Sequence, residues 1–147
     1  GSSDGVTFVD DYAHLPREIS AVMSAAKTSD DSWGRVVAVF QPNRYNRMAV
    51  MSDEYAMAFV DADVVVITDI YASGTQKIEG VTGHLVVDAV TRAQVNSQVH
   101  WHEERTSLAQ FVNRILRPGD VCISMGCGDI ESLPRELLDV RSGVTRS

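Results

Sequence analysis

The sequence predicts an α/β fold: a three-layer, Rossmann-like domain built around a mostly parallel sheet of about five or six strands. Two apolar runs, Val36–Phe40 and Val64–Ile67, have the length of strands and lack the alternation of a half-exposed strand. Such runs are typical of parallel strands that are covered on both faces. Segments with helical spacing of apolar residues alternate with these runs along the chain, which favours right-handed crossovers and a parallel sheet.

The N-terminal half predicts strand, helix, strand and helix in that order. Val6–Val9 is a short apolar strand, and Pro16 opens the following helix because its fixed φ suits the first helical turn. The apolar face of this helix consists of Ile19, Val22, Met23 and Ala26. The second strand, Val36–Phe40, ends before Pro42 because proline cannot donate to a sheet ladder. A helix from about Met48 to Phe59 is expected next.

The C-terminal half repeats this plan. The expected elements are a central strand at Val64–Ile67, a helix from about Gly83 to Val95, a short strand at Val99–Trp101, a helix through Leu116, a strand at Val121–Ile123 and a helix at Ile130–Leu138. Ser107 and Gln110 have the spacing of a capping box, which predicts that the Ser107 side chain caps the helix that Pro118-Gly119 ends.

Length and composition set the outer bounds of the prediction. The 147 residues are 44% apolar and carry a net charge of -7, which fits one globular domain and argues against a nucleic-acid partner. No apolar stretch has the length that crosses a bilayer and no secretory signal is seen, so we expect no membrane partner and a cytoplasmic location. We assign residues 1–5 to a cloning remnant and linker, 6–140 to the domain and 141–147 to a tail.

The chain has two cysteines, Cys122 and Cys127, which excludes a disulfide framework and argues against a metal site. Cys122 lies between Val121 and Ile123, so we expect it to be a buried small apolar residue. Cys127 lies between two glycines in a predicted loop. Two interpretations stay open for it: an ordinary free thiol, or the nucleophile of a cysteine enzyme.

Four loops follow predicted strands, and we expect them to meet. They are Asp10–Leu15, the arginine turn (Gln41–Arg47), Asp69–Gly74 and the glycine loop (Gly126–Asp129). The carboxyl ends of parallel strands share one edge of a sheet, where ligands collect in open α/β folds. Arg44 and Arg47 could grip a carboxylate or phosphate there in bidentate fashion. The alternative is that the arginine turn is a solvated surface loop.

Other residues of these loops keep two interpretations each. Asp69 either meets a ligand or satisfies loop amides. His14 either contacts a substrate or is structural. The rings of Tyr12, Tyr45 and Tyr71 either stack on a planar ligand group or pack against the protein.

The chain carries no P-loop for nucleotide phosphates. Its lysines are Lys27 and Lys77, and neither follows glycine in a G-x-x-x-x-G-K-[ST] arrangement. If the chain serves an ATP-dependent reaction, the lysine that grips the phosphates must therefore come from elsewhere.

In order along the chain, the four loops resemble sequence blocks of one known family. The segments DDYAHLP (10–16), FQPNRYNR (40–47), DIYASG (69–74) and GCGDI (126–130) are similar to DDYGHHP, FQPHRYTR, DVYAAG and GAGDI. Those blocks belong to the C-terminal domain of the Mur ligases of peptidoglycan synthesis, in the members that add L-alanine to UDP-N-acetylmuramate. The matches span nearly the whole chain, and four in the right order are far more specific than one.

The resemblance implies a three-domain, ATP-dependent enzyme of which this is the last domain. Its N-terminal and central domains would bind the UDP-sugar and carry the P-loop. Such ligases use ATP and Mg²⁺ to activate the substrate carboxylate as an acyl phosphate, which the amino group of L-alanine attacks. By similarity, the residues expected to contact ATP are Asp11 and Tyr12, and those expected to contact the substrates are His14, Arg44, Tyr45 and Arg47. No catalytic residue is expected in this domain alone, and we expect the fragment by itself to be inactive.

Three of the departures from the family blocks bear on the predicted site. Leu15 and Asn43 stand where the family has histidine, so no histidine role is carried over to them, and Ala13 stands in place of a glycine. Two alternatives stay open: the related ligase that recycles murein peptides, and a stand-alone nucleotide- or anion-binding module without catalysis. The arginine turn resembles the alanine-adding members more closely, which favours alanine addition.

Overall fold

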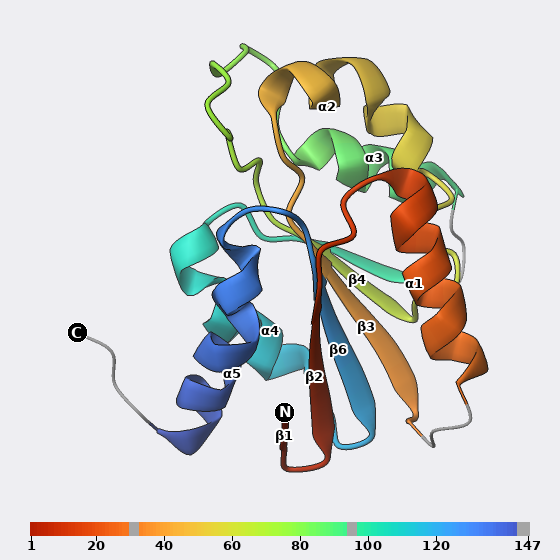
Figure 1. The fold of residues 1–147 in the computed structure, drawn as a ribbon, viewed down its shortest axis with the longest axis vertical. Helices are drawn as coiled ribbons and strands as arrows, with labels where there is room; N and C mark the ends of the chain where they lie inside the picture. The colour runs from red at the N-terminus through yellow and green to blue at the C-terminus, as the bar shows by residue number, and fades with distance from the viewer. Residues whose placement is uncertain (30–32, 94–96, 144–147) are drawn as a thin grey trace.

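The computed structural model describes residues 1–29, 33–93 and 97–143. Within these ranges one sheet contains β1 (Ser2–Ser3), β2 (Val6–Asp11), β3 (Arg35–Phe40), β4 (Val64–Ile67), β5 (Gln98–Trp101) and β6 (Asp120–Met125). The strand order is β1-β2-β6-β3-β4-β5, and all pairings are parallel except that of β1 with β2 (Figure 1). The predicted mostly parallel sheet is therefore confirmed.

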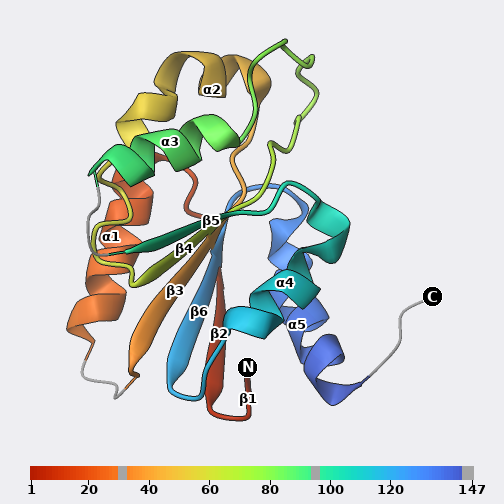
Figure 2. The ribbon, with the colours of Figure 1, turned by 180° about the vertical axis from the view of Figure 1, so that it is seen from behind.

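Helices cover both faces of the sheet and complete the predicted three layers. The α-helices are α1 (Pro16–Thr28), α2 (Tyr45–Met51), α3 (His84–Ala93), α4 (Leu108–Ile115) and α5 (Leu133–Ser142). Short 3₁₀ helices lie at η1 (Ser52–Tyr55), η2 (Arg105–Ser107) and η3 (Asp129–Ser132). Figure 1 and Figure 2 show α1, α2 and α3 on one side of the sheet and α4 with α5 on the other.

Strand β3 explains why the core divides into two parts. Val36, Ala38 and Phe40 belong to the apolar cluster that includes α1, α2 and α3. Val37 and Val39 point to the opposite face and belong to the cluster that includes α4 and α5. Alternate side chains of a strand face opposite sides, so a strand in the middle layer has to be apolar at every position.

Two helices begin or end away from their predicted bounds. The helix expected at Met48–Phe59 begins at Tyr45 and ends at Met51, where the Ser52 hydroxyl donates to the Met48 carbonyl oxygen and the chain tightens into η1. Such side-chain bonds to the preceding turn loosen an α-helix. The helix expected from Ile130 begins only after η3, with proline in its first turn. The last residues of the helix predicted to reach Val95 lie outside the described ranges.

The predicted capping box at Ser107 is wrong. Ser107 is the residue before α4, but its side chain makes no capping hydrogen bond. Its hydroxyl lies 2.8 Å from Nε2 of His102, whose ring stacks on Phe111 with the centroids 4.6 Å apart. The hydroxyl is therefore engaged by a nearby histidine, which the spacing of two residues in the sequence cannot reveal.

The segment before β2 contains β1, which forms an edge hairpin with β2; its assignment to a remnant and linker stays a prediction. Ser3 pairs with Val6, so the loop has two residues, Asp4 with φ 49° and Gly5 with φ 82°. Positive φ at both positions gives the turn type whose twist suits a β-hairpin.

In the described part of the chain, no helix has the length and apolar character that would let it cross a membrane.

Candidate functional site

The loops that follow the parallel strands meet at one edge of the sheet. The last residues of neighbouring strands lie in register: Asp11 pairs with Met125, Met125 with Phe40, and Phe40 with Ile67. The four loops therefore start at the same level, near the centre of the view in Figure 1, and the region above that level is flanked by α2. The structure brings together the loops that the sequence singled out.

The arginine turn has an unusual backbone at Arg44. This residue has φ 69° and ψ 117°, a region that non-glycine residues rarely adopt. Its side chain is exposed and makes no hydrogen bond or ion pair with the described residues. Arg47 is half-buried, and its Nη1 donates to Oδ1 of the buried Asn43 at 2.8 Å. Asn43 therefore orients Arg47, while the donors of Arg44 are available to an anion.

The loop after β4 holds the arginine turn in place. The Arg44 N–H donates to the Tyr71 carbonyl oxygen at 2.8 Å, and the Tyr71 N–H donates to the Pro42 carbonyl oxygen at 2.9 Å. The Tyr45 N–H donates to Oγ1 of Thr75 at 3.1 Å. Tyr71 and Thr75 thus hold the backbone that carries the arginines, and the two loops form one unit.

The three tyrosines of these loops differ in their surroundings. The Tyr12 side chain is 70% exposed and the Tyr71 side chain 39% exposed, whereas Tyr45 is 8% exposed and belongs to the core. Packing is therefore the interpretation that describes the Tyr45 ring, and its contact with a substrate stays a prediction. The Tyr12 ring makes an edge contact with His14, with the centroids 5.4 Å apart, and is the most exposed of the three rings and so the most accessible to a planar group.

Residues Asp11, Tyr12 and His14 form the turn after β2. Oδ1 of Asp11 accepts a hydrogen bond from the Ala13 N–H at 2.9 Å, which closes the turn. Nδ1 of His14 lies 3.1 Å from the Tyr12 carbonyl oxygen and 3.4 Å from Oε1 of Glu18. The predicted ATP-contacting and substrate-contacting residues of this segment are therefore neighbours, with the histidine facing a carboxylate.

Glu18 fixes this turn to the start of α1. Its Oε1 accepts hydrogen bonds from the N–H groups of Leu15 at 3.0 Å and His14 at 3.3 Å. These bonds lower the pKa of Glu18, and the nearby His14 and Arg47 side chains contribute in the same direction. On the other side, the hydroxyl of the buried Tyr55 donates to the His14 carbonyl oxygen at 2.7 Å. The position of His14 is thus fixed through its backbone as well as its ring.

Asp69 satisfies loop amides, one of the two interpretations that the sequence left open. Its Oδ1 accepts hydrogen bonds from the Ile70 N–H at 2.8 Å and the Gly83 N–H at 2.9 Å. A methyl group on Gly83 would lie 2.5 Å from the Thr68 carbonyl oxygen, so the two segments approach very closely. Asp69 therefore joins the end of β4 to the start of α3.

The glycine loop is held from two sides by residues far away in the sequence. Gln41 is 2% exposed, and its Nε2 donates to Oδ1 of Asp129 at 2.8 Å while its Oε1 accepts from the Ile130 N–H at 3.2 Å. From the opposite side, Arg105 donates to Oδ1 of Asp129 at 3.0 Å and pairs with both carboxylate oxygens of Glu136 at 2.9 Å and 2.8 Å. These contacts fix the loop between β6 and α5.

No role was predicted for Gln41 or Arg105, although Gln41 begins the arginine turn at this edge. Gln41 stands inside the FQPNRYNR block but was given no role of its own. Arg105 follows β5, whose last residue Trp101 is in register with Ile67 of β4. The signal that could have found Arg105 is therefore the same strand-end rule, applied to a fifth loop.

Asp10, Cys122 and Cys127 lie in these loops or in the strands that lead to them, and they differ in how deeply they are buried. Oδ1 of Asp10 accepts a hydrogen bond from Oγ of Ser124 at 3.0 Å, yet partial burial raises the pKa of Asp10 overall. Cys122 is fully buried, which raises its pKa to about 12 and confirms its predicted role as a small apolar residue. Cys127 is partly exposed in the glycine loop, and no histidine contact to it is seen among the described residues.

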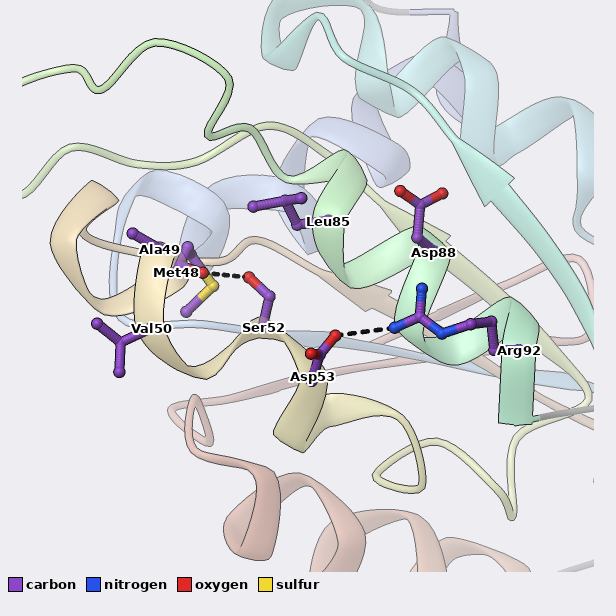
Figure 3. A pocket seen from close by; sticks show the side chains of 8 residues that line it. All are labelled: Met48, Ala49, Val50, Ser52, Asp53, Leu85, Asp88 and Arg92. Carbon is purple, nitrogen blue, oxygen red and sulfur yellow. Dashed lines mark hydrogen bonds and ion pairs between the residues drawn. The ribbon is translucent and has the colours of Figure 1, made fainter.

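A pocket of about 150 Å³ lies between α2, η1 and α3, beside the arginine turn but outside the edge. Figure 3 shows the Asp53 and Arg92 side chains meeting at one end of it, with Ala49 and Val50 toward the other end. Oδ1 of Asp53 lies 2.8 Å from Nη2 of Arg92. None of the site residues predicted from the sequence lines it. Among the described residues, no group of three histidine, cysteine, aspartate or glutamate side chains has the arrangement of a metal site.

The family model described as "Mur ligase, glutamate ligase domain" matches residues 1–128 of the chain. The chain belongs to the Mur ligase family. This confirms the resemblance found in the strand-end loops. Proteins named UDP-N-acetylmuramate–L-alanine ligase from Gloeothece citriformis and Rubrobacter xylanophilus are 44% and 40% identical to this Mur ligase domain, and each alignment covers 94% of it. The domain spans 28% and 31% of the length of these two relatives.

Solved structures of Mur ligases share the fold of this domain. The UDP-N-acetylmuramate–alanine ligase of Thermotoga maritima matches with a TM-score of 0.70 at 23% identity, covering 97% of this chain and 28% of its own. The murein peptide ligase of Psychrobacter arcticus matches with a TM-score of 0.74 at 18% identity, covering 100% of this chain and 30% of its own. A single domain of a ligase from Haemophilus ducreyi matches over 95% of its chain with a TM-score of 0.67 and 22% identity.

Proposed function

We propose that this Mur ligase domain is the C-terminal part of a bacterial, cytoplasmic, ADP-forming ligase that joins L-alanine to UDP-N-acetylmuramate. The observation that carries the proposal is the 44% identity, over 94% of the chain, to a protein named for that reaction. Because the domain spans under a third of such relatives, the P-loop and the UDP-sugar site belong in the N-terminal and central domains of the whole protein. The absence of a P-loop lysine from this sequence agrees with that division.

In this proposal the arginine turn binds the carboxylate of the incoming L-alanine. Arg44 presents an exposed guanidinium at the strand edge, and the hydrogen bond from Arg47 to Asn43 gives the second guanidinium a defined direction. A planar guanidinium binds a carboxylate through two parallel hydrogen bonds, which fixes orientation as well as position. With its carboxylate held, alanine directs its amino group at the carbonyl carbon of the acyl phosphate. The new C–N bond forms, the bond between the carbonyl carbon and the bridging phosphate oxygen breaks, inorganic phosphate leaves, and the nitrogen releases its surplus proton to water.

The turn after β2 is assigned to the nucleotide. Asp11 would accept hydrogen bonds from the ATP ribose through the carboxylate oxygen that does not close the turn, and the exposed Tyr12 ring offers a face for stacking. His14, held against Glu18, would lie between nucleotide and amino acid. Mg²⁺ would accompany the triphosphate, and the described residues contain no group of three side chains that could hold it on their own.

The proposal is tested on the full-length protein by measuring ADP formation with and without each substrate. We expect ADP formation to require both UDP-N-acetylmuramate and L-alanine. The Arg44→Ala and Arg47→Ala variants should raise the KM for L-alanine at least about tenfold, since each removes a charge-assisted bidentate contact. Arg17→Ala, which changes an exposed arginine on α1, is the matched control and should behave as the unmodified enzyme.

Three results would count against the proposal. The first is an unchanged KM for L-alanine in both arginine variants. The second is a preference for the peptide L-alanyl-γ-D-glutamyl-meso-diaminopimelate over L-alanine, which would assign the protein to murein peptide recycling. The third is tight binding of ATP by the isolated domain, well below millimolar, combined with no ligase activity of the full-length protein, which would favour a stand-alone binding module.

A further inference from the structure

We propose that Tyr71 and Gly128 are positioning residues that set the place of the Arg44 guanidinium and, through it, the affinity for the amino acid substrate. The inference rests on the proposed function, because it takes Arg44 to be the residue that binds the alanine carboxylate. Neither Tyr71 nor Gly128 needs to touch the substrate in order to act in this way.

The backbone of Arg44 cannot hold its conformation by itself. A φ of 69° at a non-glycine residue is strained and persists only where the surroundings enforce it. The enforcing contacts come from Tyr71, whose carbonyl oxygen accepts from the Arg44 N–H and whose N–H donates to Pro42. An isolated β-bridge between Asn43 and Tyr71 runs alongside these bonds. The direction in which the Arg44 side chain points away from the backbone therefore depends on the position of Tyr71.

The ring of Tyr71 lies directly on the backbone of Gly128. A Cβ atom added at Gly128 would lie 2.5 Å from Cγ and 2.6 Å from Cδ1 of Tyr71. No other residue fits at this position without moving the ring, since real Cβ atoms do not approach other atoms so closely. The Tyr71 hydroxyl makes no hydrogen bond to the described residues, so the contact depends on the ring and not on its polar end.

The glycine loop, on which the Tyr71 ring rests, is itself held in place. The glycine loop is tied to Gln41 on one side and to Arg105 on the other through Asp129. A ring seated on a fixed loop is itself fixed, and its backbone then fixes the arginine turn. Gly128 in the loop after β6 thus contacts the Tyr71 ring in the loop after β4, and the Tyr71 backbone contacts Arg44 in the loop after β3.

The test uses the full-length ligase and separates the KM values of its substrates. We expect Tyr71→Ala to raise the KM for L-alanine about tenfold, since a displacement of about 1 Å in a positioning group has effects of this size or larger. The KM for ATP should stay within about twofold, because Asp11 and Tyr12 are not part of these contacts. Tyr71→Phe keeps the ring and should restore the unmodified KM for L-alanine. Ile78→Ala, in the same loop but away from these contacts, is the matched control.

Gly128→Ala tests the same contact from its other side and should also raise the KM for L-alanine. The new methyl group would in addition lie 2.7 Å from Oε1 of Gln41, so this variant is compared with Tyr71→Ala only if its urea unfolding midpoint shows that it is folded. Tyr71→Ala does not introduce a clash and carries the test if Gly128→Ala fails to fold.

The outcomes distinguish this inference from the proposed function. If Arg44→Ala raises the KM for L-alanine and Tyr71→Ala does not, the positioning role is overturned and the proposed function stands. If Tyr71→Ala raises the KM values for L-alanine and ATP equally, the effect is general damage and the inference is also overturned. If Arg44→Ala has no effect while Tyr71→Ala does, Tyr71 does not act through Arg44, and both the inference and the assignment of Arg44 fail.

Discussion

Replacing Gln41 by methionine should destabilise the domain by about 2–3 kcal/mol. Gln41 is 2% exposed and makes two hydrogen bonds that methionine, of similar length, cannot make. Loss of the bond to the Asp129 carboxylate costs about 1.5 kcal/mol, at the lower end for charged partners because Asp129 is half exposed and keeps Arg105. The Ile130 N–H, buried in a residue with no exposed surface, loses its acceptor at a cost of about 2 kcal/mol. Better burial of the thioether offsets about 1 kcal/mol of the sum.

The assay is thermal unfolding of the domain, followed by far-ultraviolet circular dichroism. For a chain of this size, a loss of about 2–3 kcal/mol corresponds to a drop in Tm of roughly 5–10 °C. The matched control is Gln98→Met, because Gln98 is exposed at the start of β5 and should change Tm by no more than about 1–2 °C. Equal Tm values for the two variants would refute the reasoning and would mean that the Gln41 amide does not hold the glycine loop.

Three further predictions concern the same domain. Gly83→Ala should lower the free energy of unfolding by more than about 2 kcal/mol, because its methyl group would meet the Thr68 carbonyl oxygen at 2.5 Å; an unchanged urea midpoint would contradict this. Asp10→Asn should raise Tm at pH 7. Burial raises the pKa of Asp10 above its ordinary value of 3.8, so its ionised form disfavours folding at neutral pH and the gain should vanish below pH 3.8; a gain that persists there would refute the cause. Iodoacetamide should label Cys127 in the native domain and leave Cys122 unmodified until the protein unfolds, as mass spectrometry of the peptides would show.

The sequence predicted the fold best where a pattern of residues fits only one place in the structure. Continuous apolar runs at Val36–Phe40 and Val64–Ile67 predicted the middle of the sheet, because no other placement buries every side chain of a strand. The same logic placed four loops at one edge, and the register of the strands places them there. Family blocks then supplied the predicted roles of individual loop residues, which the strand-end rule alone cannot assign.

The sequence did not predict side-chain contacts whose partners lie far away along the chain or that no spacing rule describes. Ser107 fitted a capping box, but the His102 ring engages its hydroxyl. Gln41 and Asp129 are 88 residues apart, and no local pattern announces their hydrogen bond. For Tyr45 the sequence left packing and ligand contact both open; the helix begins at Tyr45 and its ring belongs to the core, while its contact with a substrate stays a prediction. Such choices are made by tertiary packing, which outweighs local preference.

The position of β6 in the sheet affects how the domain folds during its synthesis. β6 is the last strand in the sequence, but it lies between β2 and β3 and pairs with both. During synthesis, the strands β2 and β3 therefore stay apart, each with an unpaired edge, until residues 120–125 have left the ribosome. Pairing over more than a hundred residues closes a long loop, which slows folding and exposes apolar edges to aggregation. A chain cut before Asp120 would be a hazard to the cell, so we expect it to be found with chaperones or in inclusion bodies.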